Sequence, residues 1–330
     1  MKTLPEKIEQ ALINDHVLHK KDKILIACSG GPDSVALFHL FRSLRTGWSF
    51  RLGLAYFNHG LRKQAARGDE FFVRNLGKDY RVSVYLGRGE VQKAAKQEKA
   101  SLEEAGRKLR YEFLIRTAKR YGYSKVLLAH HQNDQAETVL MRMLQGTGIS
   151  GLCGIRKVLQ KDGVVFYRPL LAIKKIEILD YLKQQKLKFR KDASNQSIQF
   201  LRNKIRRQLI PYLETSFNPR VLDALCRIPD SVGEEVKALD FFQAQAWKGC
   251  FKKRKVSQIF LKAEKFFSFP PAIQFRILNQ ALRELDPQSG LSYDAWSRIR
   301  AGLGRKSGRR WSLPKNIDLS FTSNQLLLKR

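Results

Sequence analysis

Short apolar runs alternate with segments of helical periodicity over residues 1–190. Within those segments apolar residues recur three and four positions apart, which is the spacing of one buried helix face. Strands that alternate with helices form right-handed βαβ units and a parallel sheet. The pattern therefore predicts an α/β fold, a Rossmann-like parallel sheet with helices on both faces. The predicted strands are residues 23–28, 52–57, 82–86, 126–129 and 164–167, and the predicted helices are residues 33–44, 65–78, 134–144 and a long one that opens with a capping box at residues 101–104.

The alternation ends near Pro211 and Pro219. Beyond them the pattern is mainly helical, and short alternating runs predict small strands at residues 311–313, 317–321 and 325–328. We therefore predict two domains, an α/β domain over residues 1–213 and a smaller, mainly helical domain over residues 214–330.

The chain is strongly basic. It holds 62 lysines and arginines against 30 aspartates and glutamates, a formal net charge of +32. Such an excess attracts polyanions over long range, and nucleic acid is the commonest partner of this kind. Two basic clusters with aromatic residues nearby lie in the second domain. A basic run is often only a solvated surface, but on this chain the clusters favour contact with RNA. The candidate residues are Lys252, Lys253, Arg254, Arg305, Arg309 and Arg310.

The four cysteines show no CxxC spacing, so they predict neither a zinc ribbon nor a disulfide framework. The first residues lack the apolar region of a secretion signal, and no apolar run is long enough to cross a membrane. We expect a cytoplasmic protein with reduced thiols and no membrane contact.

A turn with two glycines follows the first predicted strand and opens the first predicted helix. Glycine lets the backbone approach phosphate oxygens and adopt φ values that other residues avoid, and proline suits the first turn of a helix. The serines offer hydroxyls to phosphate, while Asp33 could cap the helix or help to hold Mg²⁺. Ligands of open parallel sheets bind beyond the carboxyl ends of the strands, where helix N-termini favour anions. The predicted phosphate-binding residues are Ser29, Gly30, Gly31, Pro32, Asp33 and Ser34.

The loop SGGPDS resembles the PP-loop of the N-type ATP pyrophosphatases. Members of that family cleave ATP between the α and β phosphates, activate an oxygen of a second substrate as an adenylate, and let a nucleophile displace AMP. Further stretches resemble, in the same order, motifs of the tRNA(Ile)-lysidine synthases within this family. The resemblance covers about residues 20–215, and the stretches are HGLR at 59–62, EAGRKLRYEF at 104–113, HQNDQAET at 131–138, GTGISGL at 146–152, RPLL at 168–171, DASN at 192–195 and RNKIR at 202–206.

The resemblance implies a ligase that joins L-lysine to the 2-position of the wobble cytidine in a tRNA(Ile) with a CAU anticodon. ATP would be the co-substrate and Mg²⁺ the cofactor, an adenylated cytidine the intermediate, and AMP and pyrophosphate the released products. The modified tRNA would read AUA instead of AUG and carry isoleucine identity instead of methionine identity. Residues 1–213 would be the catalytic domain and residues 214–330 a basic tRNA-binding domain, with a homodimer as one arrangement of the chain.

The same motifs supply candidate catalytic residues: Asp33, Arg110, Asp134, Glu137 and Arg202. The forks of Arg110 and Arg202 suit the charge that develops on pyrophosphate. Asp134 and Glu137 are three residues apart on one helix face and are implied to bind lysine. As structural alternatives, Glu137 could pair with Arg142 or Lys174, and Arg110 could cover the core. The HGLR motif adds His59 and Arg62, which could contact tRNA or nucleotide or serve a structural role.

One motif departs from the family pattern. Lysidine synthases commonly carry two adjacent aspartates, whereas Asn133 precedes Asp134 in this chain. An amide brings no negative charge to a metal ion, so any Mg²⁺ role would fall to Asp134 and Asp33.

Two other functions stay open at this point. A tRNA thiolase of the 2-thiocytidine type shares the fold, but such enzymes usually need a cysteine pair or an iron–sulfur cluster, and Cys28 has no evident partner. A non-catalytic RNA-binding protein could keep the fold for its basic surface, and it would bind tRNA with a steep salt dependence but release no AMP. The intact loop favours an enzyme.

Overall fold

The computed structural model describes residues 2–61, 63–190, 201–303, 308–322 and 324–330, and it contains two compact units, Met1–Asp230 and Ser231–Arg330. The division lies inside helix α12 (Val221–Cys250), later in the chain than the predicted boundary after residue 213. The reason is packing: helix α11 (Ile210–Ser216) and the first turns of α12 place Ile210 and Leu225 in one apolar cluster with helix α7 (Gln132–Leu144).

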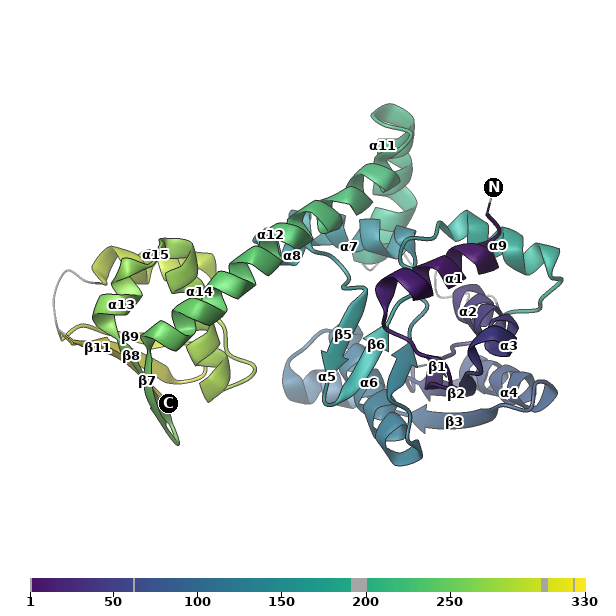
Figure 1. The fold of residues 1–330 in the computed structure, drawn as a ribbon, viewed down its shortest axis with the longest axis horizontal. Helices are drawn as coiled ribbons and strands as arrows, with labels where there is room; N and C mark the ends of the chain where they lie inside the picture. The colour runs from purple at the N-terminus through teal and green to yellow at the C-terminus, as the bar shows by residue number, and fades with distance from the viewer. Residues whose placement is uncertain (1, 62, 191–200, 304–307, 323) are drawn as a thin grey trace. The chain divides into compact units, whose positions relative to one another are not determined.

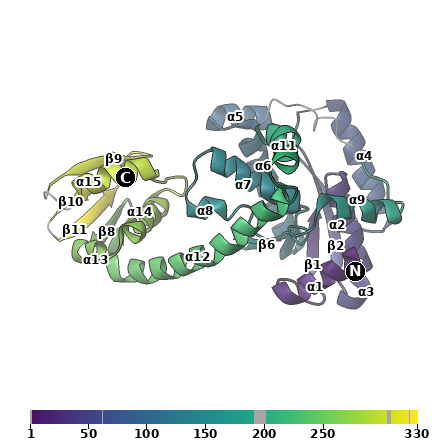
Figure 2. The ribbon, with the colours of Figure 1, turned by 90° about the horizontal axis from the view of Figure 1, so that it is seen from above.

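A six-stranded sheet forms the centre of the first unit (Figures 1 and 2). Its order is β3-β2-β1-β4-β6-β5, and neighbouring strands are parallel except β5 and β6. The five parallel strands are those predicted from the apolar runs, which confirms the α/β fold. The strands are β1 (Lys23–Ala27), β2 (Arg51–Asn58), β3 (Ser83–Arg88), β4 (Lys125–Leu127), β5 (Val158–Lys161) and β6 (Val164–Tyr167).

Strand β5 was missed because it has no apolar run: three of its four residues are exposed. It pairs with β6 across a turn at Asp162 and Gly163, whose φ angles are 49° and 78°. Two consecutive positive φ angles are typical of the tight turns that join antiparallel strands.

Alternate strand residues face opposite layers of helices. Ile24 and Ile26 pack in one apolar cluster with helices α1 (Leu4–Asp15), α2 (Pro32–Ser43) and α9 (Lys175–Gln184). Leu25, between them in sequence, packs in a second cluster with helix α6 (Leu102–Tyr121). Figure 1 shows the two layers, with α6 on one side of the strands and α1 and α2 on the other. Because both faces are covered, ligands can approach at the carboxyl ends of the strands.

Local sequence signals set the ends of the long helix α6. The Ser101 hydroxyl accepts from Glu104 N, and the Glu104 carboxylate accepts from Ser101 N, which confirms the predicted capping box. The helix ends at Gly122, whose φ is 69°. The other helices of this unit are α3 (Arg45–Trp48), α4 (Lys63–Asp79), α5 (Val91–Glu98), α8 (Ile149–Leu152), α10 (Leu201–Lys204) and the π-helix η2 (Ile205–Leu209).

The second unit contains helices and a five-stranded antiparallel sheet of order β7-β8-β11-β10-β9. The three predicted strands at the end of the chain are β9 (Arg310–Leu313), β10 (Ile317–Phe321) and β11 (Gln325–Lys329). The hairpin of β7 (Phe251–Lys255) and β8 (Gln258–Lys262) was missed, because four consecutive cations in β7 conceal any alternation. Helices α13 (Ala263–Ser268), α14 (Pro271–Leu285) and α15 (Tyr293–Gly302) complete the unit.

The core of the second unit lies between this sheet and its helices. Leu319 and Leu326 of the sheet join Ile277 of α14 and Trp296 of α15 in one buried cluster. Among the described residues, no helix combines the length and the apolar character that crossing a bilayer requires.

Candidate active site

The phosphate loop lies between the end of β1 and the start of α2. The Ser34 hydroxyl donates to Gly31 O at 3.0 Å and accepts from Ser29 N at 3.2 Å, so it closes the turn from inside. Pro32 occupies the first helical turn, as predicted. A cavity of about 170 Å³ lies beside the loop, and its lining residues are Ala27, Ser29, Gly31, Asp33, Ser34, Arg110, Leu128, Ala129 and His130.

Only one of the two loop glycines needs an unusual φ. Gly30 has a φ of +84°, and its carbonyl accepts from Arg190 N at 2.9 Å. A Cβ atom at Gly30 would also lie 3.3 Å from the Phe72 ring. Gly31 differs from the prediction: it is the N-cap of α2 with a φ of −72°, which any residue can adopt.

Asp33 is therefore not the cap of α2. One of its oxygens forms an ion pair with Lys175 Nζ, from the first turn of α9, and the other lies 3.7 Å from His131 Nε2. The same His131 nitrogen lies 3.5 Å from an Asp134 oxygen. The two carboxylates predicted as metal ligands thus approach one imidazole from the N-terminal turns of two helices.

A larger pocket of about 470 Å³ shares the residues Arg110 and His130 with the loop cavity. It brings together four of the residues predicted from separate motifs: His59, Arg110, Asp134 and Arg202. Its other lining residues are Leu61, Leu102, Glu103, Gly106, Arg107, His130, Asn203 and Arg206.

Two arginines hold the acid pair of α7. Glu137 accepts from Arg202 Nε at 3.0 Å and from Arg206 Nε and Nη2 at 2.6 and 2.9 Å, and its side chain is 1% exposed. Asp134 lies 3.4 Å from Arg202 and 3.3 Å from Arg206. Arg206 lies in the π-helix η2, a rare element that often marks functional sites. The structural alternative for Glu137 is wrong, because Arg142 donates to backbone carbonyls and Lys174 pairs with Asp223.

The electrostatics of the pocket favour anionic ligands near Arg110. Its Nε atom is buried and has no hydrogen-bond partner among the described residues. Burial lowers the pKa of Arg110, and the positive charges of Arg107, Arg168 and Arg202 lower it further. A partly buried guanidinium among other cations is stabilised when an anion binds next to it.

The two imidazoles of the pocket are neutral near pH 7. Burial and the charge of Arg110 lower the pKa of His59 to about 4, and burial lowers the pKa of His130 well below its usual value. Arg168 Nε donates to His130 Nδ1 at 3.2 Å, so the proton of the neutral ring lies on Nε2.

Asp134 is ionised in the same pocket. Burial alone would raise its pKa, but the interactions with His131 and Arg202 and a backbone hydrogen bond from His131 outweigh burial and lower it.

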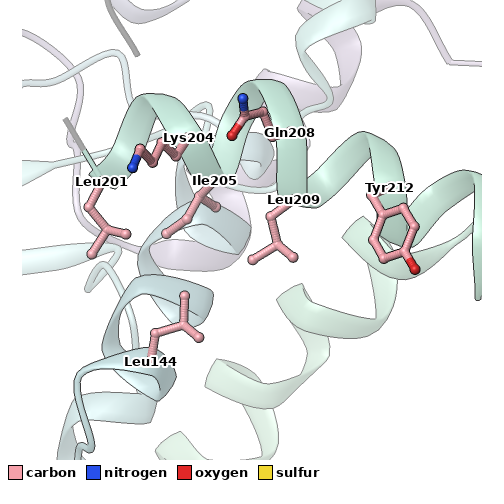
Figure 3. A pocket seen from close by; sticks show the side chains of 7 residues that line it. All are labelled: Leu144, Leu201, Lys204, Ile205, Gln208, Leu209 and Tyr212. Carbon is pink, nitrogen blue, oxygen red and sulfur yellow. The ribbon is translucent and has the colours of Figure 1, made fainter. Parts of the chain in front are cut away.

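A separate apolar hollow of about 380 Å³ lies where η2 meets the end of α7 (Figure 3). Leu144 at the end of α7 points toward Ile205 and Leu209. Ile205 is 1% exposed and belongs to the apolar cluster that also contains Ala136 and Val139 of α7. This packing fixes η2 on α7, and with it the position of Arg206. The lining residues are Leu144, Leu201, Lys204, Ile205, Gln208, Leu209 and Tyr212.

His59 lines the larger pocket, and the other predicted RNA-contacting residues lie in the second unit or outside the described residues. Lys252, Lys253 and Arg254 lie exposed on β7, with Lys253 Nζ 4.8 Å from the centre of the Phe260 ring. Arg309 and Arg310 are exposed at the start of β9. Arg62, Arg305 and the DASN motif lie outside the described residues.

Three cations of the site were not predicted. Arg206 ends the RNKIR motif one helical turn after Arg202, so their spacing was the signal that could have identified it. Arg107 lies one turn before Arg110 in the same way. Lys175 had no local signal, because its partner Asp33 is 142 residues away in sequence.

Comparisons with known proteins agree with this architecture. Residues 2–213 match the family model described as a PP-loop domain. The chain is 33% identical over 327 residues to a tRNA(Ile)-lysidine synthase of Symbiobacterium thermophilum, and the match covers 96% of this chain and 67% of that protein. The chain belongs to the tRNA(Ile)-lysidine synthase family. A second relative with this name, from Caldanaerobacter subterraneus subsp. tengcongensis, is 31% identical, with 98% of this chain and 69% of the relative covered.

This chain spans only part of the length of its lysidine synthase relatives. The match to the tRNA(Ile)-lysidine synthase of Clostridium tetani is 34% identical and covers 82% of this chain but 57% of that protein. Among solved structures, the U34-tRNA thiolase NcsA from Methanococcus maripaludis is similar, with a TM-score of 0.58, 20% identity, and 70% of this chain and 78% of that chain covered. This similarity shows the fold alone.

Proposed function

We propose that this protein is a tRNA(Ile)-lysidine synthase. It joins L-lysine to C2 of the wobble cytidine of a CAU-anticodon tRNA(Ile), consumes ATP, and releases AMP and pyrophosphate. The observation that carries the proposal is Arg110, a half-buried arginine whose Nε has no hydrogen-bond partner among the described residues and which lines both the loop cavity and the larger pocket. Arg110 can therefore contact both a phosphate bound in the loop cavity and a base bound in the larger pocket.

In the first step the cytidine O2 attacks the α-phosphorus of ATP. The new bond joins O2 to this phosphorus, the bond between the α-phosphorus and the bridging oxygen breaks, and pyrophosphate leaves with the electron pair. Gly30 and Gly31 let the loop approach the phosphates, and Ser29 and Ser34 supply hydroxyls. Arg110 stabilises the charge that develops at the transferred phosphate, because a preorganised cation in a site shielded from water costs no reorganisation.

The carboxylates of Asp33 and Asp134 fit a Mg²⁺ ion that also binds the phosphates. Their oxygens lie 3.7 and 3.5 Å from the same atom, His131 Nε2, and Asp33 lines the loop cavity. Magnesium commonly uses one or two carboxylates together with substrate phosphates and water, and it does not need a cage of protein ligands. When bound, the ion would neutralise charge on the phosphates, and Asp33 and Asp134 would hold it.

In the second step the ε-amine of lysine attacks C2 of the adenylated cytidine. The C2–N bond forms, the C2–O2 bond breaks, AMP leaves with O2, and the amine loses a proton to water. Asp134 lines the pocket and is ionised, so it can hold the incoming ammonium. Its lowered pKa makes it a weak proton acceptor, so we assign it to binding and positioning the amine. Glu137 has both oxygens bound by arginines, so we assign it to positioning Arg202 and Arg206, with Arg202 at the edge of the pocket.

The tRNA is proposed to contact His59 at the larger pocket and the basic residues of the second unit. Lys252, Lys253, Arg254, Arg309 and Arg310 are the candidates that the structure describes. Cytoplasmic localisation and a homodimer remain predictions, and light scattering on the purified chain measures the second.

The thiolase alternative is not favoured by the thiols. All four cysteines are free, and the described residues contain no group of three His, Cys, Asp or Glu side chains that could hold a metal ion. Burial raises the pKa of Cys28 beside the loop, which opposes a reactive thiolate.

Incubation of the protein with ATP, Mg²⁺, labelled lysine and the CAU-anticodon tRNA tests the proposal. We expect lysine to enter the tRNA with one AMP released per lysine. Incorporation of sulfur instead of lysine would support the thiolase, and tRNA binding without AMP release would support the non-catalytic alternative.

A further inference from the structure

Lys175, in the first turn of α9, contacts the phosphate loop and belongs to none of the family motifs found in the chain. Its ammonium pairs with Asp33, and Asp33 lines the loop cavity. We propose that Lys175 binds the pyrophosphate that leaves ATP in the first step. This inference rests on the proposed function in one respect, because it takes the loop to bind ATP and release pyrophosphate.

Two hydrogen bonds join the start of α9 and the residues just before it to the start of α7. Gln132 N donates to Ile173 O at 2.9 Å, and Lys175 N donates to Asn133 Oδ1 at 3.1 Å. Lys175 follows β6, which lies next to β4 in the sheet, while Asp33 follows β1 on the other side of β4. The carboxyl ends of three neighbouring strands therefore bring Lys175 to the loop without help from nearby sequence.

The Lys175 side chain is positioned for a ligand and is not buried as part of the core. It is 30% exposed, and its partner Asp33 is 27% exposed, so both can exchange partners without either charge losing contact with water. If Asp33 held Mg²⁺, the ammonium of Lys175 would be free to bind the β and γ phosphates. Pyrophosphate carries several negative charges as it leaves, and a lysine ammonium stabilises such a group as a point charge.

Asn133 acquires a role in this arrangement. Its amide oxygen accepts the Lys175 backbone N–H, so it orients the start of α9 without adding a negative charge. Because residue 133 is an amide, it does not compete with Asp33 for the ammonium of Lys175. Asparagine at this position, where the family commonly has aspartate, is therefore compatible with a pyrophosphate site.

The neighbouring residue provides a matched control. Lys174 is 49% exposed and pairs with Asp223 at 3.0 Å, and Asp223 lines neither cavity, whereas Asp33, the partner of Lys175, lines the loop cavity. Lys174→Met and Lys175→Met remove the same charge from adjacent positions, so a general effect of net charge appears in both variants and a site effect in one.

Binding of pyrophosphate to the full chain in the presence of Mg²⁺, measured by calorimetry, is the primary readout. We expect Lys175→Met to weaken binding about ten- to a hundredfold, as expected when one charge-assisted hydrogen bond is removed. Lys175→Arg should restore most of the affinity, and Lys174→Met should bind like the wild type. Product inhibition of AMP release by pyrophosphate should weaken in Lys175→Met, while the KM for lysine stays unchanged.

Equal pyrophosphate affinity in Lys175→Met and Lys174→Met would overturn the inference, as would a wild-type chain that binds no pyrophosphate. Circular dichroism of each variant excludes misfolding, and the arginine variant keeps the test decisive if the methionine variant misfolds. A failure of the proposed function has a different signature: pyrophosphate binds and depends on Lys175, but no lysine enters the tRNA.

Discussion

Replacing Glu137 with glutamine removes the negative charge that Arg202 and Arg206 share. The carboxylate accepts three hydrogen bonds from the two guanidinium groups, at 3.0, 2.6 and 2.9 Å, and the side chain is 1% exposed. Glutamine keeps the shape and one accepting oxygen. Its amide NH₂ group, however, would replace the second carboxylate oxygen and place a donor opposite an arginine N–H, which is also a donor.

The expected loss of stability follows from these contacts. A hydrogen bond to a charged group contributes about 1.5–3 kcal/mol, and breaking a buried ion pair costs roughly 3–5 kcal/mol. Two features reduce the cost. Arg202 and Arg206 keep 24% and 37% of their side chains exposed, and Asp134 remains 3.4 and 3.3 Å from them as a second anion. We therefore expect the free energy of unfolding of the first unit to fall by about 2–3 kcal/mol.

Urea unfolding followed by far-ultraviolet circular dichroism measures this loss. Glu103→Gln is the matched control, because Glu103 lies 3.7 Å from Arg202 Nη1 but is 56% exposed. An exposed pair of this kind contributes less than about 1 kcal/mol. If the two variants lose the same stability, the buried cluster of α7 and η2 is not an energetic unit, and the reasoning is refuted.

Three further predictions concern the loop, the core and the basic surface. Gly30→Ala should lose ATP binding and about 1–2 kcal/mol of stability, because the φ angle of Gly30 is +84°. The control Gly47→Ala, in open space, should change neither ATP binding nor stability. Unaltered ATP affinity in Gly30→Ala would contradict the role of the loop. Burial and Arg42 lower the pKa of His39 to about 4, so the unfolded chain binds the extra proton and the free energy of unfolding should fall as the pH drops from 6.5 toward 4. His39→Leu should flatten this pH dependence in urea titrations, and an unchanged slope would argue against it. Neutralising residues 252–254 of β7 should weaken tRNA binding. The slope of log K against log salt concentration should become shallower by about 0.7–0.9 for each phosphate contact that is lost. An unchanged slope would remove β7 from the interface.

The elements of the fold were predictable where the signal was local. The apolar runs identified the five parallel strands, and the Ser101 capping box identified the start of α6, because burial and capping act on neighbouring residues. Strand β5 and the hairpin β7–β8 were not identifiable, because tertiary pairing stabilises exposed and charged residues that have no strand pattern of their own.

The site followed the same division. The motifs named Arg110, Asp134 and Arg202 correctly as neighbours, since all three line one pocket. The four-residue spacing of Arg202 and Arg206 could have indicated a second cation, but not that both would bind Glu137, which lies 69 residues before Arg206. Lys175 was out of reach for the same physical reason, since the sheet alone brings it to Asp33.

Lysine-dependent release of AMP tests the central claim most directly. The protein is incubated with ATP, Mg²⁺ and either the CAU-anticodon tRNA(Ile) or a tRNA(Met) with the same anticodon, with and without lysine. The account predicts that labelled lysine enters tRNA(Ile) in equal amount to the AMP formed, and that Asp134→Asn abolishes incorporation. Active protein that releases AMP with tRNA(Ile) but leaves lysine free would contradict it.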